Sequence, residues 1–117
     1  MTNKDIQTLE SDYRDLAEAH GAATQRGDYK AANKSYGKLI AVLAKIRVKG
    51  KDGEASLLNL VRDQNESVPC WAATHSLPFA ESSALAVLEA LALRVGPIAF
   101  DAKMVVQQWK KGQLVIP

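Results

Sequence analysis

The segment from Leu57 to Ala73 constrains the fold of this chain most strongly. It holds one apolar run that ends near Arg62, a short turn of acidic and amide residues, and a second apolar run that begins at Val68 and contains Trp71. Short helices joined in this way cannot bury their apolar faces alone, so they stack on neighbouring helices. We therefore expect an all-α fold of stacked helices, an architecture that more often binds partners than catalyses reactions.

Apolar residues recur at helical spacing through most of the chain. The pattern predicts about six helices, at residues 4–26, 29–48, 54–62, 67–77, 80–94 and 98–110. Gly27 is suited to end the first helix and Asp28 to cap the second, while Ser67 is suited to cap the fourth. Gly37, inside the second helix, indicates a close helix crossing. The tryptophans, Trp71 and Trp109, have apolar neighbours at helical spacing and are expected to anchor the core.

The length of 117 residues predicts one domain, with a helical hairpin over 1–49, further helices over 54–112 and an extended tail over 113–117. A break at Gly50–Gly53 separates the hairpin from the rest. A single cysteine excludes an internal disulfide, and residues 1–20 lack the pattern of a signal peptide. The most apolar stretch, 84–95, is too short for a membrane span. We expect a cytoplasmic protein without a membrane partner.

No motif in the sequence indicates catalysis, a metal or a cofactor. His20 lies on the apolar stripe of the first helix without a second ligand one turn away, and His75 is equally isolated. We interpret both histidines, and Cys70, as structural residues of the interior. The carboxylates of the first helix are spread around it and do not converge on one site. We therefore expect that the protein is not an enzyme.

Three patterns give the chain a resemblance to a known family: His20 with Gly27-Asp28 and Asn33, the turn from Asp63 to Val68 with Ala72-Ala73, and the ending from Phe100 through Asp101, Trp109 and Gly112 to Pro117. The middle pattern resembles a HEAT-like repeat. The whole chain resembles a small bacterial family of domains of unknown function, number two thousand and nineteen. The resemblance implies an α-α superhelix and no activity. The chain departs from the repeat at Pro69, where HEAT-like repeats usually place a basic residue.

Charge is unevenly distributed along the chain. Residues 21–51 are strongly basic, whereas residues 1–20 and 52–101 are acidic, and blocks of opposite sign can satisfy one another when helices stack. Five lysines of the second helix fall within an arc of about 100° opposite its apolar residues. They are Lys30, Lys34, Lys38, Lys45 and Lys49.

This lysine surface is the candidate binding site, although an ordinary solvated helix face has the same pattern. The first hypothesis is a protein-binding module, and by analogy with other small bacterial proteins an immunity protein that neutralises a toxin by direct contact. The alternative is a nucleic-acid-binding α-solenoid that uses the lysines on phosphates. The near-neutral total charge and the lack of aromatic residues on that face favour a protein partner over nucleic acid.

Overall fold

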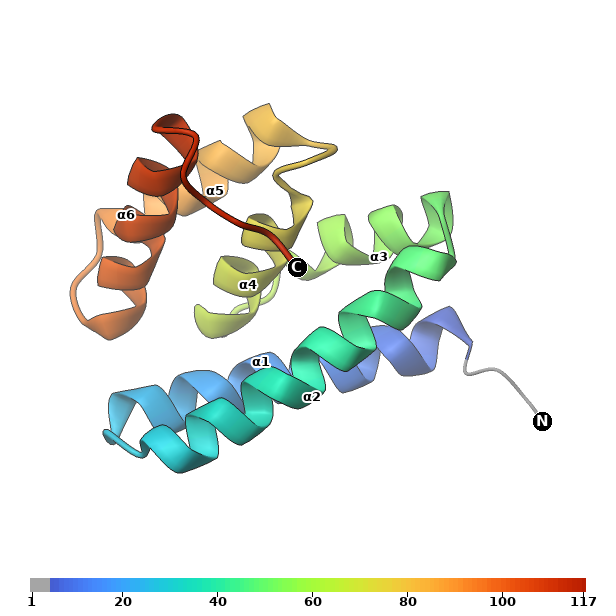
Figure 1. The fold of residues 1–117 in the computed structure, drawn as a ribbon, viewed down its shortest axis with the longest axis horizontal. Helices are drawn as coiled ribbons and strands as arrows, with labels where there is room; N and C mark the ends of the chain where they lie inside the picture. Colours follow the sequence, from blue (N-terminus) through green and yellow to red (C-terminus); the bar gives the residue numbers. More distant parts are fainter. Residues whose placement is uncertain (1–4) are drawn as a thin grey trace.

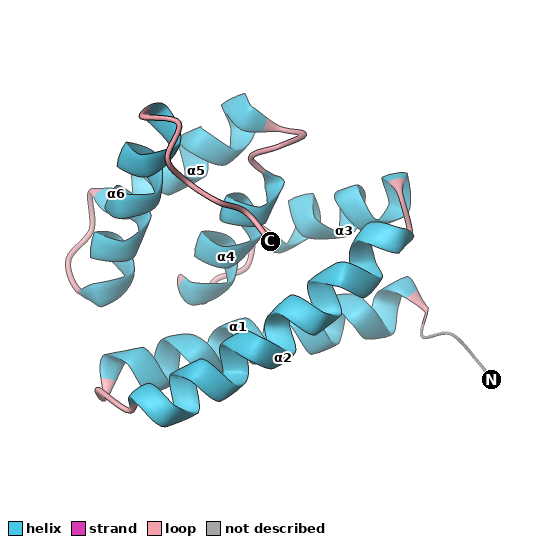
Figure 2. Cartoon of the chain, viewed as in Figure 1, coloured by secondary structure: helices cyan, strands magenta, loops and turns pink. Residues whose placement is uncertain are grey.

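The computed structural model describes residues 5–117, which form six helices and no strand (Figures 1 and 2). The prediction of an all-α fold is confirmed. The helices are α1 (Ile6–Gln25), α2 (Tyr29–Val48), α3 (Lys51–Leu60), α4 (Ser67–Ser76), α5 (Glu81–Ala92) and α6 (Pro97–Lys110). None of these helices combines the length and apolarity that crossing a lipid bilayer requires.

The ends of the first two helices follow local rules. The Asp5 carboxylate accepts a hydrogen bond from the Thr8 N–H at 2.8 Å and caps α1; the expected start at Lys4 lies outside the described residues. Gly27 adopts a left-handed conformation with φ of 73°, and Asp28 caps α2 by accepting from the Ala31 N–H at 3.1 Å. The bounds of α2 agree with those predicted.

The predicted break between the hairpin and the later helices is wrong in extent. The turn needs only Gly50, with φ of 61°, and α3 begins directly after it at Lys51 instead of Glu54. Gly53 is therefore a helical residue, and it is buried because α3 crosses the end of α2 there. A Cβ atom on Gly53 would lie 2.0 Å from the backbone oxygen of Ile46.

Two further local predictions are corrected. Gly37 does not mark a helix crossing, because a Cβ atom there would have no neighbour within 4 Å. The close approach in α1 is at Gly21, where a Cβ atom would lie 1.6 Å from the Ser67 Oγ. Ser67 is the first residue of α4 and not its cap. The N-cap is Glu66, whose side chain makes no capping hydrogen bond, and the Ser67 N–H donates to the Asn65 Oδ1 at 3.0 Å in the preceding turn.

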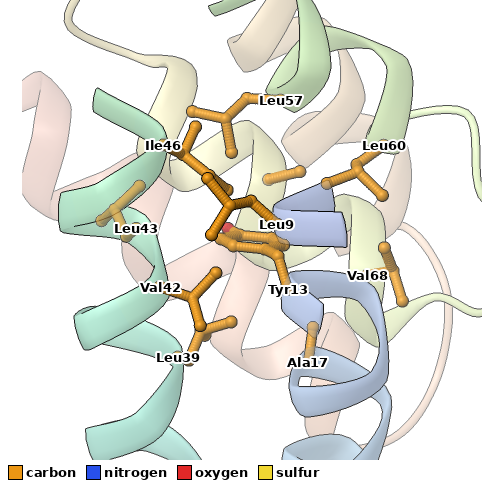
Figure 3. Close-up of a cluster of buried hydrophobic side chains, with 11 residues drawn as sticks. Leu9, Tyr13, Ala17, Leu39, Val42, Leu43, Ile46, Leu57, Leu60 and Val68 are labelled. Carbon is orange, nitrogen blue, oxygen red and sulfur yellow. The ribbon is translucent and has the colours of Figure 1, made fainter. Parts of the chain in front are cut away.

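Two clusters of buried side chains form the core, and α4 takes part in both. The first lies between α1, α2, α3 and α4, with the Tyr13 ring at its centre (Figure 3). The second lies between α4, α5 and α6, and Leu114 and Ile116 of the tail pack against it. Every residue of α4 except Trp71 is buried. The central place of α4 in Figure 1 follows from this double contact.

A basic residue does connect neighbouring elements, but it comes from α1 and not from the position of Pro69 in α4. The Arg14 side chain on α1 donates to the Asp63 Oδ2 at 2.7 Å in the turn between α3 and α4, and it also contacts Glu18 at 3.1 Å. Glu10, one turn earlier, accepts hydrogen bonds from Ser56 and Asn59 of α3. These contacts dock α1 on the α3–α4 turn. The regular HEAT-like superhelix stays a prediction.

Candidate functional site

A groove between α1, α4 and α6 brings polar side chains of these helices next to apolar ones. Its volume is about 310 Å³, near the lower end of the usual size for small-ligand sites. His20 of α1, Cys70 and Trp71 of α4, and Asp101 and Gln108 of α6 line it. Polar groups from three helices thus meet over an apolar floor.

Hydrogen bonding fixes the orientation of His20. The Trp71 Nε1–H donates to the His20 Nδ1 at 3.3 Å, and the two rings are nearly perpendicular. An indole nitrogen can only donate, so Nδ1 must be the acceptor and the neutral imidazole carries its proton on Nε2. Tyr36 of α2 and His75 of α4 also lie against Trp71, at ring-centroid distances of 5.5 Å each. Trp71 is thereby held in an aromatic cluster contributed by α1, α2 and α4.

The ionisable groups of the groove have shifted pKa values in opposite directions. Burial lowers the pKa of His20, an effect that the nearby Asp101 charge partly offsets. Burial likewise raises the pKa of Asp101, and His20 partly offsets that shift. Both shifts favour the uncharged forms, as desolvation requires. The lowered pKa leaves the His20 imidazole uncharged at neutral pH.

Cys70 in the floor of the groove is not a nucleophile. Burial, with smaller contributions from Asp101 and Glu66, raises the pKa of its thiol to about 12. A reactive cysteine needs the opposite shift, because the thiolate is the attacking species. Its prediction as a buried thiol is confirmed. Within residues 5–117 no three His, Cys, Asp or Glu side chains are placed to hold a metal ion.

The two histidines have different surroundings. His75 is buried, as expected, and its Nδ1 lies 2.6 Å from the Tyr13 hydroxyl in the first core cluster. Burial, with a smaller contribution from Arg47, lowers its pKa to about 3. His20 is hydrogen-bonded, as expected, but only half-buried, so it lies at the surface of the groove and not in the interior.

The tryptophans, Trp71 and Trp109, are partly buried against the two core clusters, which agrees with their prediction as anchors.

The lysine surface is a separate region on α2. Lys30, Lys34, Lys38 and Lys45 are exposed, and Lys49 is half-buried. None of the five forms an ion pair with another described residue. Acidic residues of α1 border this surface. Lys38 lines a shallow depression together with Asp12 and Asp15, and the charge of Lys49 contributes, after the Thr8 hydrogen bond, to a lowered pKa of Asp5.

Sequence reasoning missed the groove because its walls come from opposite ends of the chain. His20 and Asp101 were visible as members of the patterns behind the family resemblance, but spacing could not show that α4 brings their helices together. Nor could spacing show the hydrogen bond between Trp71 and His20. The lysine surface, in contrast, depends on one helix alone and was predicted with its exposure.

The fold and these surfaces define an all-helical protein with a small polar groove and a basic helix face. Residues 7–109 match the family model described as domain of unknown function (DUF2019), and the chain belongs to this family. The crystal structure of the protein RPA1889 from Rhodopseudomonas palustris is similar, with a TM-score of 0.88 and 22% sequence identity over 98% of this chain and 96% of that chain. At this identity the likeness establishes the fold. No curated protein matches the sequence.

Proposed function

We propose that the protein is a non-enzymatic binding module that docks an acidic protein partner on the lysine surface of α2. The observation that carries this proposal is the exposure of Lys30, Lys34, Lys38 and Lys45 on one helix face, without an ion pair to another described residue. Uncompensated charges of one sign accelerate association with a partner of opposite charge and select against partners of like charge.

The neighbouring charges favour a protein over nucleic acid. Asp12 and Asp15 border the lysine surface beside Lys38, and a continuous phosphate backbone crossing this region would approach their carboxylates. A folded partner can place its acidic side chains selectively over the lysines. Within this proposal the partner is a bacterial toxin and the protein its immunity protein. That narrower assignment rests on analogy with other small bacterial proteins.

A charge-reversal variant tests the docking surface. Lys30, Lys34 and Lys45 are each replaced by Glu, and the matched control replaces three exposed basic residues elsewhere, Arg62, Lys103 and Lys111, to give the same change in net charge. Exposed substitutions of this kind usually change stability by less than ~0.5 kcal/mol each. Both variants should therefore fold.

The readout is affinity purification from the native host, followed by association kinetics with the purified partner at low and high salt. We expect an acidic protein that binds the wild type and the control but associates much more slowly with the reversal variant. Equal association with all three proteins would refute the docking surface. Salt-sensitive binding of random duplex DNA, lost only in the reversal variant, would favour the nucleic-acid alternative. A partner that is toxic when expressed alone and harmless when co-expressed with this chain would support the immunity role.

A further inference from the structure

We propose that the groove between α1, α4 and α6 binds a small neutral molecule carrying an amide-type edge, in which a hydrogen-bond acceptor stands beside a donor on an apolar body. The groove is distinct from the proposed docking surface, since none of the five lysines lines it. The inference rests on the groups that His20 and Asp101 offer to a ligand and on the apolar surface between them.

His20 offers a donor. Its Nδ1 accepts from the Trp71 indole N–H, so the proton of the neutral ring lies on Nε2. Nε2 has no hydrogen-bond partner among the described residues, and it is not one of the buried atoms cut off from solvent. Because Trp71 occupies the Nδ1 edge and His20 lines the groove, the Nε2 edge is available to a bound ligand.

Asp101 offers an acceptor. The residue is exposed, its carboxylate forms no hydrogen bond or ion pair with any residue in the range 5–117, and it is near enough to His20 for their charges to interact. A polar group that lines a groove and lacks a protein partner is one that a ligand can engage. The groove thus presents a donor and an acceptor near one another.

The remaining surface favours an uncharged, partly apolar ligand. Ile98, Met104 and Val105 of α6 line the groove together with the protonated thiol of Cys70, and its further polar residues, Ser67, Thr74 and Gln108, are all neutral. A purely anionic ligand would meet the Asp101 carboxylate, and a ligand with donors alone would leave the imidazole N–H without an acceptor. A carboxamide or lactam attached to a small ring carries an acceptor for the His20 N–H beside a donor for Asp101, and its ring covers the apolar surface. The volume of about 310 Å³ accommodates a molecule of that size.

Three probes of similar shape and different hydrogen-bonding pattern test this assignment: benzamide, benzoate and benzamidine. The nitrogen-15 NMR spectrum of the labelled protein supplies the readout with an internal control. The indole N–H of Trp71 is bonded to His20 in the groove, whereas that of Trp109 donates to Glu81 at 3.1 Å and lies outside it. We expect benzamide to shift the Trp71 resonance saturably while the Trp109 resonance stays in place.

Benzoate should bind at least ~10-fold more weakly than benzamide, since it has no donor for Asp101 and meets the charge of that carboxylate. Asp101→Leu should weaken benzamide binding by a similar factor, and Lys103→Ala on the same helix should leave it unchanged. Benzamidine binding more tightly than benzamide, and depending on Asp101, would overturn the assignment in favour of a cation site. A Trp71 resonance that none of the probes shifts, in a protein whose spectrum is otherwise native, would also overturn it.

Discussion

Replacing two helical glycines by alanine should change stability in opposite directions, because only one of them lies at a helix crossing. Gly37 is exposed, and a Cβ atom there meets nothing within 4 Å. Gly37→Ala should therefore stabilise the protein by up to ~1 kcal/mol, the difference in helix propensity. A Cβ atom at Gly53 would lie 2.0 Å from the Ile46 backbone oxygen, so α2 and α3 must separate by roughly 1 Å to reach a normal contact. Overpacking of this kind costs ~1–3 kcal/mol or more, which outweighs the same gain in propensity.

Because the gain in helix propensity is common to both variants, they should differ by the overpacking cost, ~1–3 kcal/mol or more. Urea unfolding followed by circular dichroism measures this difference, and thermal melts should separate the two midpoints by at least about 3 °C. An unchanged dependence on urea concentration would show that both variants unfold from equally compact native states. Equal stabilisation by both substitutions would refute the crossing at Gly53, and destabilisation by Gly37→Ala would refute the exposure of that helix face.

Three further outcomes are expected. Acidification should destabilise the protein between pH 6.5 and about 3, because His75 binds a proton in the unfolded chain but not in the folded protein, where its pKa is about 3. Urea unfolding at pH 4 should show a loss of roughly 3 kcal/mol in the free energy of unfolding, and His75→Asn should remove that loss. Emission from Trp71 and Trp109 should be blue-shifted because each packs against a core cluster, and water-like spectra from both would contradict their packing. Arg14→Ala should destabilise the protein because it removes the contact with Asp63 in the α3–α4 turn, whereas Arg26→Ala, at an exposed ion pair, should have little effect on urea unfolding. Equal losses would contradict the docking role of Arg14.

Features that depend on one helix were predictable from the sequence, and features that depend on two were not. The start of α2 follows from the Asp28 side chain, and the exposure of Lys34 follows from its angular distance from the apolar stripe. The importance of Gly53 depends on where α3 crosses α2, which no local pattern specifies. Tyr29 shows the same limit. It has the spacing of the apolar stripe yet is 79% exposed, because it begins α2 at the outer end of the hairpin (Figure 1).

The groove shows this limit for function. The position of His20 on the stripe of α1 predicts burial. The ring is only half-buried, because it lies at the edge of the groove that α1, α4 and α6 form together and that Asp101 also lines. A periodicity argument places a residue on a face, but the residue's surroundings are set by the helices that cover that face.

The double contact of α4 has a consequence for how the molecule opens. Val68 and Ala72 belong to the first core cluster, while Cys70, Ala73 and Leu77, just after the helix, belong to the second. If the α1–α2 hairpin detached, or if α5 and α6 did, α4 would lose the cover of one side and expose apolar surface. The two clusters are therefore coupled, and unfolding should proceed as one cooperative event without a stable half-molecule. Amide protons of α4 should exchange with solvent only through global unfolding, so that a helix of 10 residues reports the stability of the whole chain.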